Sequence, residues 1–290
     1  MTRSTFRTLL FKAFAEKRLL VIPGAHDALS ARLAQASGHD CLFIGGFPVV
    51  GTRLGVPDIG LGALGEISDA VRCIAGACDL PMLVDIDDGY GDVKNAVHSV
   101  HVYERMGVRA VFLEDQAWPK RCGHMTGKAV VPPEVMEAKI RATNAERMHA
   151  ETLICARTDA RAVNGFDDAL RRAERYIKAG AEAIFVEAPE SVKELEILGK
   201  AFDVPQFANP LMGGKTPILT PRELEQLGFT AIPFGLDAIF HAALAMKNVY
   251  DDMKSGAFAL RGGGMKFEDY KKIVGYDEWD RIDDAWGLKK

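Results

Sequence analysis

Acidic side chains follow two short apolar runs of the sequence, residues 81–84 and 110–113. If both runs are strands, side chains alternate between two faces, so Asp85 and Asp87 share one face. A neighbouring parallel strand that ends in Glu114 brings a third carboxylate to the same edge. Three carboxylates repel one another unless a cation lies among them, and Mg²⁺ and Mn²⁺ prefer such oxygen ligands. The spacing therefore predicts a divalent-cation site; the alternative is a solvated acidic loop after each run.

Several reactive side-chain types gather in the polar segment PKRCGH, residues 119–124. Cys122 is flanked there by Lys120, Arg121 and His124. Nearby cations stabilise a thiolate, so we expect Cys122 to lose its proton more easily than a free cysteine does. Such a group can exchange a proton near neutral pH or attack as a nucleophile. The alternative is a surface loop that contains an incidental cysteine.

A recurrent unit indicates which elements position these side chains. An amphipathic helical pattern, a glycine and a short apolar run follow one another repeatedly, with the glycine at Gly38, Gly107, Gly180 and Gly228. Glycine suits the left-handed position that ends a helix, and the apolar run suits a strand buried on both faces of a parallel sheet. The pattern is typical of alternating helices and strands.

Adding the remaining apolar runs gives eight expected strands: Leu20–Pro23, Cys41–Gly45, Met82–Asp85, Ala110–Glu114, Leu153–Arg157, Ala183–Glu187, Pro205–Asn209 and Ala231–Phe234. Helical patterns follow most of them, at Ala28–Ser37, Glu66–Ala77, Val93–Met106, Pro133–Ala145, Asp167–Ala179, Val192–Ala201, Pro221–Leu227 and Leu236–Met253. Eight alternating units predict a (β/α)8 TIM-type barrel.

Polar residues follow these strands at the end where a barrel carries its chemistry. They are Gly45, Gly46, Asp85, Asp87, Glu114, Asp115, Arg157, Asp159, Glu187 and Asn209. A doubly wound parallel sheet gathers its strand ends at one edge too. The pattern therefore supports a site more firmly than it supports closure of the barrel.

Composition limits the classes of partner and compartment. The 290 residues carry a net charge of −4 with a pI near 6.0, which argues weakly against a nucleic-acid partner. The five cysteines show no metal-finger or CxxC spacing, and their odd number favours a reducing, cytoplasmic compartment. Charges interrupt the apolar runs near the N-terminus, so we expect neither a signal peptide nor a membrane span.

The chain is expected to form one catalytic barrel domain over residues 1–260 and a helical tail over residues 261–290. No linker rich in Pro, Gly or Ser divides the barrel, whereas RGGGMK at Arg261 marks a change of composition. The tail mixes aromatic and charged residues at helical spacing. It either packs on a neighbouring subunit or is a frayed terminal helix.

Seven motifs, in order, resemble those of the isocitrate lyase and phosphoenolpyruvate mutase superfamily. They are PDIG at Asp58, VDIDDGYGD, FLEDQ, KRCGH, ARTDA, FVEAP and ANP at Asn209. The likeness runs from about Ile22 to the helix after Phe234. KRCGH is the most specific of them, and it is similar to the cysteine-bearing loop of the carbon–carbon lyase branch, which comprises 2-methylisocitrate, 2-alkylmalate and dimethylmalate lyases and oxaloacetate hydrolase.

This resemblance implies roles for individual residues. Asp85, Asp87 and Glu114 match a Mg²⁺ cluster in which Asp87 is the direct ligand, and Asp58 matches a carboxylate beside it. Arg157, Glu187 and Asn209 match groups that hold substrate oxygens. Arg157 could instead be a structural ion-pair partner of Asp159 or Glu187.

The resemblance also implies a moving part and an assembly. Cys122 matches the catalytic acid/base of a mobile gating loop that also carries Lys120 and His124. His124 either orients Cys122 or caps the loop. The family fold is a barrel whose last helix is often exchanged between subunits of a homotetramer.

The implied reaction is cleavage of a small 2-hydroxy dicarboxylate. The substrate chelates Mg²⁺ (or Mn²⁺) through its hydroxyl and adjacent carboxylate, which eases removal of the hydroxyl proton. Retro-aldol cleavage then leaves a 2-oxoacid and a carbanion that Cys122 protonates, while Arg157 stabilises the growing negative charge. Closure of the loop excludes water.

Two departures from the family pattern bear on the substrate. Gly45, Gly46 and Phe47 stand where close methylisocitrate lyases carry Ser-Gly-Gly, and Met212 stands where relatives commonly carry glutamate. Both changes predict a less polar pocket, and so a 2-alkylmalate or dimethylmalate in preference to 2-methylisocitrate. Oxaloacetate hydrolysis is an alternative. KRCGH disfavours a phosphonopyruvate or carboxyphosphonoenolpyruvate mutase-type enzyme, and a catalytically idle metabolite-binding barrel is the alternative of another class.

Overall fold

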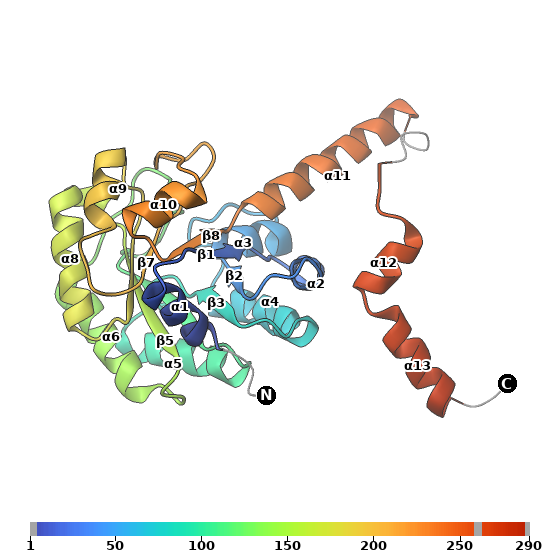
Figure 1. The fold of residues 1–290 in the computed structure, drawn as a ribbon, viewed down its shortest axis with the longest axis horizontal. Coiled ribbons are helices and arrows are strands. Elements are labelled where there is room, and N and C mark those ends of the chain that lie inside the picture. Colours follow the sequence, from blue (N-terminus) through green and yellow to red (C-terminus); the bar gives the residue numbers. More distant parts are fainter. Residues whose placement is uncertain (1–4, 258–262, 288–290) are drawn as a thin grey trace.

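The computed structural model describes residues 5–257 and 263–287. Eight strands in this part of the chain form one parallel sheet (Figure 1). They are β1 (Leu20–Pro23), β2 (Leu42–Ile44), β3 (Met82–Asp85), β4 (Ala110–Glu114), β5 (Leu153–Thr158), β6 (Ala183–Val186), β7 (Gln206–Phe207) and β8 (Ala231–Phe234).

Helices connect the strands and surround the sheet. They are α1 (Phe6–Ala15), α2 (Ala28–Ala36), α3 (Gly46–Leu54), α4 (Leu64–Ala77), α5 (Val93–Arg105), α6 (Pro133–Glu146), α7 (Ala160–Asn164), α8 (Phe166–Lys178), α9 (Val192–Leu198), α10 (Pro221–Leu227), α11 (Asp237–Ser255), α12 (Phe267–Ile273) and α13 (Tyr276–Trp286).

The strand order decides between the two predicted architectures. The strands are paired in the order β1-β8-β7-β6-β5-β4-β3-β2, and β1 pairs with β8 over its whole length. Between the two ends of this series, the Ala25 N–H donates to the Phe43 carbonyl over 2.9 Å, next to a parallel bridge between Gly24 and Phe43. The sheet is therefore a nearly closed barrel, and the prediction of a (β/α)8 fold is confirmed.

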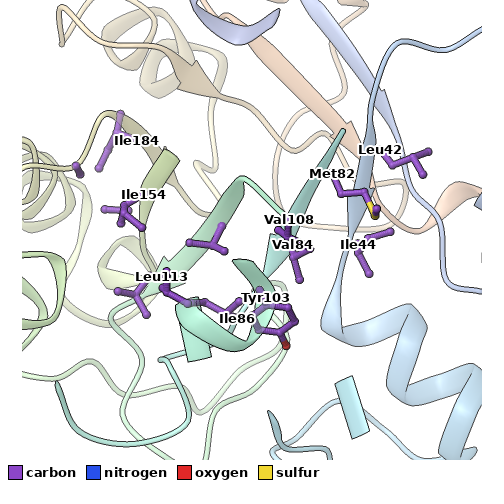
Figure 2. Packing of buried hydrophobic residues seen from close by; sticks show 14 of the residues in the cluster. Leu42, Ile44, Met82, Val84, Ile86, Tyr103, Val108, Leu113, Ile154 and Ile184 are labelled. Atoms are coloured by element: carbon purple, nitrogen blue, oxygen red, sulfur yellow. The ribbon is translucent and has the colours of Figure 1, made fainter. Parts of the chain in front are cut away.

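Buried side chains form two layers, as the alternation of strand side chains requires. One cluster fills the barrel interior, where the Phe112 ring lies 4.8 Å from that of Phe207 and 5.4 Å from that of Phe185, centroid to centroid. The other lies between the strands and the helices, and Figure 2 shows part of it around Val84, Ile86, Leu113 and Ile154. Packing on both faces fixes where each strand ends.

Local signals in the sequence explain several helix starts. Asp27 caps α2 by accepting from the Ser30 N–H, and Asp92 caps α5 by accepting from the Asn95 N–H. Thr220 and Glu223 form a reciprocal capping box at α10. The expected helices agree with the observed ones within a few residues at each end.

Three helices of the described chain were not predicted, α1, α3 and α7, whereas α12 and α13 lie in the predicted helical tail. In α1, Phe6 and Leu10 are fully buried and belong to the cluster in the barrel interior. This helix therefore closes the barrel at the end opposite to the strands' carboxyl ends. The short helix α3 begins at Gly46, directly after β2, and so starts at the carboxyl edge of the sheet.

The C-terminal helices do not extend the barrel. α11 projects away from it and has no buried residue (Figure 1). The Arg32 side chain of α2 donates to the Ile273 carbonyl of α12 over 3.4 Å. The predicted domain boundary at residue 260 lies outside the described residues, and exchange of a helix between subunits stays a prediction. In the described chain, no helix combines the length and apolar character needed to cross a membrane.

Candidate active site

One cavity opens at the carboxyl ends of the strands. Every predicted site residue except Asp87 lines it: Gly45, Gly46, Phe47, Asp58, Asp85, Glu114, Lys120, Cys122, His124, Arg157, Glu187 and Asn209. Asp87 lies beside them, 2.6 Å from Lys120 Nζ. The structure thus brings these predicted site residues together, whereas Met212 lies outside the cavity.

A tight turn, and not strand alternation, brings Asp85 and Asp87 together. β3 ends at Asp85, and Asp87 adopts a left-handed backbone conformation with φ 50°. In this turn the Asp87 N–H donates to Asp85 Oδ1 over 3.0 Å. Left-handed backbone is rare for residues other than glycine and clusters at functional sites, although aspartate tolerates it better than most.

Lys120 is a buried cation between two carboxylates. Its Nζ lies 2.6 Å from Asp58 Oδ1 and 2.6 Å from Asp87 Oδ1. Burial lowers the Lys120 pKa, but Asp87 and Asp58 outweigh it, so the pKa is raised well above its ordinary value. Burial also raises the pKa of Asp87 to about 7, against the opposing effect of Lys120.

Arg157 lies among four carboxylates at the end of β5. Its guanidinium makes two hydrogen bonds to Asp159, of 2.9 and 3.2 Å, and lies 3.3 Å from Glu114 Oε2 and 3.2 Å from Glu187 Oε2. Asp85 Oδ2 is more distant, at 3.8 Å. Both ion-pair partners proposed for Arg157 from the sequence, Asp159 and Glu187, are confirmed as contacts. Its role in substrate binding stays a prediction.

The donor set suits a hard divalent cation. Among the residues that the structure describes, six carboxylates lie in and around the cavity, against the four cations Lys120, Arg121, Arg157 and Lys128. The carboxylates are Asp58, Asp85, Asp87, Glu114, Asp159 and Glu187. Glu114 Oε1 is buried without a hydrogen-bond partner, and Asp87 Oδ1 is buried with only the Lys120 ion pair beside it. Burial raises the pKa of Glu114 well above its usual range, more than Arg157 lowers it. A bound metal ion would stabilise the negative charge of these buried carboxylates.

The carboxylates are nevertheless divided between Lys120 and Arg157. Within residues 5–257 and 263–287, no group of three His, Cys, Asp or Glu side chains could hold a metal ion as it stands. The fit to Mg²⁺ or Mn²⁺ therefore rests on the oxygen donors and their unsatisfied atoms, and not on a preformed coordination shell.

Cys122 faces the cavity from the loop between β4 and α6, residues 115–132. The Cys122 N–H donates to the Asp58 carbonyl over 3.2 Å, and Gln116 exchanges two hydrogen bonds with the Arg121 backbone. Burial raises the pKa of the Cys122 thiol, and this outweighs the hydrogen bond from the His124 N–H and the charge of Arg157. The prediction of an easily ionised thiol is wrong, because Lys120 turns to the carboxylates and burial dominates. The raised pKa favours the protonated form of the Cys122 thiol.

Two further residues of this loop, Gly123 and Lys128, were missed from the sequence. A Cβ on Gly123 would lie 2.6 Å from Arg157 Nη2 and closer still to Glu187 Oε2, so the backbone there approaches the ion pair directly. Lys128 Nζ donates to Asp159 Oδ1 over 2.6 Å and to the Gly123 carbonyl. No spacing in the sequence indicates these contacts, because they depend on how the loop folds back.

His124 contacts elements beyond its own loop. The Lys215 N–H donates to His124 Nδ1 over 3.2 Å, and His124 Nε2 lies 3.4 Å from Glu187 Oε1 and 3.3 Å from Asn209 Nδ2. Burial lowers the pKa of His124, against the opposing charge of Glu187. Neither role considered from the sequence, orienting Cys122 or capping the loop, includes these contacts with residues that follow β6 and β7.

The apolar side of the cavity agrees only in part with expectation. Phe47 lines it and packs edge-on against Phe240 of α11, with ring centroids 6.1 Å apart. Met212 is 74 % exposed and does not line the cavity, whereas Leu211 does. The inference that Met212 makes the pocket less polar is therefore wrong, because its side chain points to solvent.

Comparison with known proteins finds relatives along most of the chain. A family model described as phosphoenolpyruvate phosphomutase matches residues 11–254. A 2,3-dimethylmalate lyase of Eubacterium barkeri is 37 % identical over 254 residues, 88 % of this chain and 86 % of that protein. A 2-methylisocitrate lyase of Halalkalibacterium halodurans is 36 % identical over 271 residues, which cover 92 % and 89 % of the two chains.

Solved structures with the same fold also match over nearly the whole chain. An oxaloacetate acetylhydrolase in complex with the inhibitor 3,3-difluorooxalacetate superimposes with a TM-score of 0.92 at 28 % identity, covering 99 % of this chain and 97 % of that one. A phosphonopyruvate hydrolase in complex with oxalate and Mg²⁺ has a TM-score of 0.84 at 27 % identity, covering 99 % and 100 %.

Proposed function

Because the chain belongs to the phosphoenolpyruvate mutase/isocitrate lyase superfamily, we propose that it is a carbon–carbon lyase, more narrowly an oxo-acid lyase. It cleaves a 2-hydroxy dicarboxylate to a 2-oxoacid such as pyruvate and a carboxylic acid. The observation that carries this proposal is the half-buried thiol of Cys122, with a raised pKa, in one cavity with Arg157 and a cluster of carboxylates.

The carboxylate cluster is the proposed metal site. Asp85, Asp87, Glu114 and Asp58 would hold Mg²⁺ or Mn²⁺ through their oxygens, and two of those oxygens have no hydrogen-bond partner. When bound, the metal polarises the substrate's hydroxyl and carboxylate oxygens, so that the hydroxyl proton is easier to remove. The solved relative with oxalate and Mg²⁺ supports a divalent metal for this family.

Other residues of the cavity hold the substrate carboxylates. Arg157 and Asn209 present donors, and the backbone from Gly45 to Phe47 forms the N-terminus of α3, where free N–H groups favour an anion. Glu187 holds Arg157 in place over 3.2 Å. Arg157 also stabilises the negative charge that grows as the carbon–carbon bond breaks, a contribution of about 3–4 kcal/mol for one well-placed donor.

Cys122 supplies the proton that completes the reaction. The electron pair of the broken carbon–carbon bond stays on the departing fragment, which takes the thiol proton and leaves a thiolate. The hydroxyl proton is released to solvent in the same turnover, and the Cys122 thiolate takes one proton back from solvent, so the overall reaction is neutral in protons. A raised thiol pKa keeps Cys122 in the protonated form that this step needs.

The substrate carries an alkyl group on this proposal. Phe47, Leu211, Pro233 and Leu236 give the cavity an apolar side. Among the described cations that line the cavity, Lys120 and Arg157 are already paired with carboxylates, which leaves Arg121 for the third carboxylate of 2-methylisocitrate. A 2-alkylmalate or 2,3-dimethylmalate therefore fits better. Faster pyruvate release from 2-methylisocitrate than from dimethylmalate would overturn this preference.

Oxaloacetate hydrolysis is the second candidate, and its support is the superposition with the acetylhydrolase at a TM-score of 0.92. The two activities yield different products. Hydrolysis of oxaloacetate gives acetate and oxalate, and lyase cleavage gives pyruvate or another 2-oxoacid. Assaying both product sets with one preparation decides between them.

The deciding experiment is a substrate screen with Mg²⁺, repeated after chelation, on the wild type and on Cys122→Ala. We expect turnover of an alkyl-substituted malate that needs the metal and is lost in Cys122→Ala, while Mg²⁺ binding by calorimetry is retained. Cys73→Ala, which removes an exposed cysteine outside the cavity, is the matched control. Activity that survives Cys122→Ala on every acid would refute the cysteine's role. Absence of turnover on all of them would favour a catalytically idle barrel that binds a metabolite.

The proposal extends to the assembly and the compartment. α11 exposes Phe240, Leu244, Val249 and Tyr250, and side chains of α11 line a groove with residues of β1 and α2. We propose a homotetramer in which the C-terminal helices are exchanged between subunits, because this assembly would cover these surfaces. Five free cysteines suit a cytoplasmic location. Light scattering of the purified chain tests the assembly, and a monomer at micromolar concentration would overturn it.

A further inference from the structure

We propose that two loops at the rim of the cavity open and close together as one lid, joined through His124. The first loop is residues 115–132, between β4 and α6, and the second is residues 208–220, between β7 and α10. The inference rests on the proposed function only in treating the cavity as the substrate site. His124 is then a positioning residue. Through it, the position of Asn209 on the second loop depends on the position of the loop that carries Cys122.

The hydrogen bonds of His124 determine which ring nitrogen carries the proton. The Lys215 N–H donates to Nδ1 over 3.2 Å, so Nδ1 is an acceptor without a proton. A neutral imidazole then carries its proton on Nε2, which lies 3.4 Å from Glu187 Oε1. The nitrogen and oxygen of the Asn209 amide are interchangeable by a flip of the side chain. With the oxygen turned toward Nε2, it can accept the Nε2 proton. One ring thus links the first loop to the second loop and to Glu187, directly after β6.

The contact between the loops is close as well as polar. A Cβ on Gly214 would lie 2.6 Å from His124 Nδ1 and 2.9 Å from its Cε1. Gly214 does not have a left-handed backbone, so the need for glycine there comes from the histidine ring and not from φ. The His124 side chain is only 9 % exposed. The second loop can therefore leave only if the ring loses its contacts on that side.

The two loops differ in how else they are held. The first has anchors apart from His124, namely the Cys122 hydrogen bond to Asp58 and the Lys128 ion pair with Asp159. Across residues 210–216, the polar contacts described outside the loop are the His124 bond and an ion pair of Lys215 with Glu190 at 3.5 Å. Part-exposed ion pairs stabilise little. We therefore expect the second loop to close only after the first loop has closed over the cavity.

Hydrogen–deuterium exchange of the free protein tests the coupling without any substrate. In His124→Ala, we expect the peptides covering 208–220 to exchange about five- to tenfold faster, because one buried hydrogen bond and its packing are lost. His124→Asn retains an acceptor at the position of Nδ1, and so should restore protection of 208–220 to within about twofold of wild type. His124→Gln places its amide near Nε2 and should not. Failure of His124→Asn to restore protection would overturn the specific bond.

A substitution in the second loop tests the reverse direction. Gly214→Ala adds a methyl group against the imidazole without backbone strain, so exchange should rise in 115–132 as well as in 208–220. Met212→Ala, in the same loop but exposed to solvent, is the matched control and should change neither. Faster exchange confined to 208–220 in Gly214→Ala would show that the loops move independently, and would overturn the proposal.

These outcomes are separate from those of the proposed function. Coupled exchange in a chain without lyase activity would support the lid and refute the lyase. Where the lyase activity is present, His124→Asn should keep kcat within about threefold of wild type, because Cys122 is untouched. The same variant should raise KM by a larger factor than it lowers kcat, because the Nε2 contact beside Asn209 is lost. A purely structural role for His124 would change stability without this difference between kcat and KM.

Discussion

The cavity is formed by two groups of side chains that are held in different ways. Asp85, Glu114 and Arg157 stand on strand ends, where paired strands and two packed layers fix their backbones. Lys120, Cys122 and His124 stand on a long loop that is held by hydrogen bonds and ion pairs to Asp58, Asp87 and Glu187. Changes in the strand group should therefore cost stability as well as activity, whereas changes in the loop group should cost mainly activity.

Removing the cation at the centre of the strand group should have the largest effect. Arg157→Met leaves Glu114, Asp159 and Glu187 buried without their shared partner, and loss of one member of a buried ion pair costs about 3–5 kcal/mol. We expect the free energy of unfolding in urea to fall by this amount and activity to disappear. Arg161→Met removes a more exposed arginine and should cost under about 1 kcal/mol. Equal losses in the two variants would contradict the comparison.

Cys122→Ala is the corresponding test of the loop group. Removal of a general acid lowers kcat by about 10²–10⁴-fold. The free energy of unfolding should change by less than about 1 kcal/mol, because the loop is anchored through the Cys122 backbone and not its thiol. Stability comes from urea denaturation and kcat from 2-oxoacid release. A loss of stability as large as that of Arg157→Met would place Cys122 with the strand group.

Metal binding should stabilise the strand group. A ligand that binds only the folded state adds about 2.7 kcal/mol at one hundred times its Kd, so Mg²⁺ should raise the unfolding free energy by about that amount. Asp87→Asn should abolish the increase, since it removes the charge of a predicted ligand. Asp251→Asn, on exposed α11, is the control and should retain it. A wild type that Mg²⁺ does not stabilise would contradict the metal site.

The same division explains what the sequence could and could not predict. The strand group was predicted correctly because short apolar runs mark where strands end, so Asp85, Glu114, Arg157 and Glu187 could be placed at one edge. Asp87 was placed correctly for an incomplete reason, since a left-handed turn directs its side chain. Strand bounds matched closely because burial on both faces leaves little freedom.

The loop group was only partly predictable, because its contacts join residues that are distant in sequence. The neighbours of Cys122 in the sequence suggested a lowered thiol pKa, but Lys120 turns away to Asp58 and Asp87, and burial raises the pKa. Helix α1 was missed because its few buried side chains pack inside the barrel, a tertiary contact that a short amphipathic segment does not indicate.

The smallest expected effect, and the finest test of the comparison, is Gly123→Ala. The backbone of Gly123 is not left-handed, so alanine fits the local conformation, but its Cβ would collide with the Arg157–Glu187 ion pair when the loop is seated. The variant should fold with an unfolding free energy within about 1 kcal/mol of wild type. A displaced Cys122 should lower kcat/KM about tenfold to a hundredfold, because small misplacements of reacting groups cost that much. Gly76→Ala, in α4 with open space at its Cβ, is the control and should raise stability by about 0.5–1 kcal/mol without affecting activity. If Gly123→Ala were fully active, the loop would not need to seat on the ion pair, and the two groups would function independently.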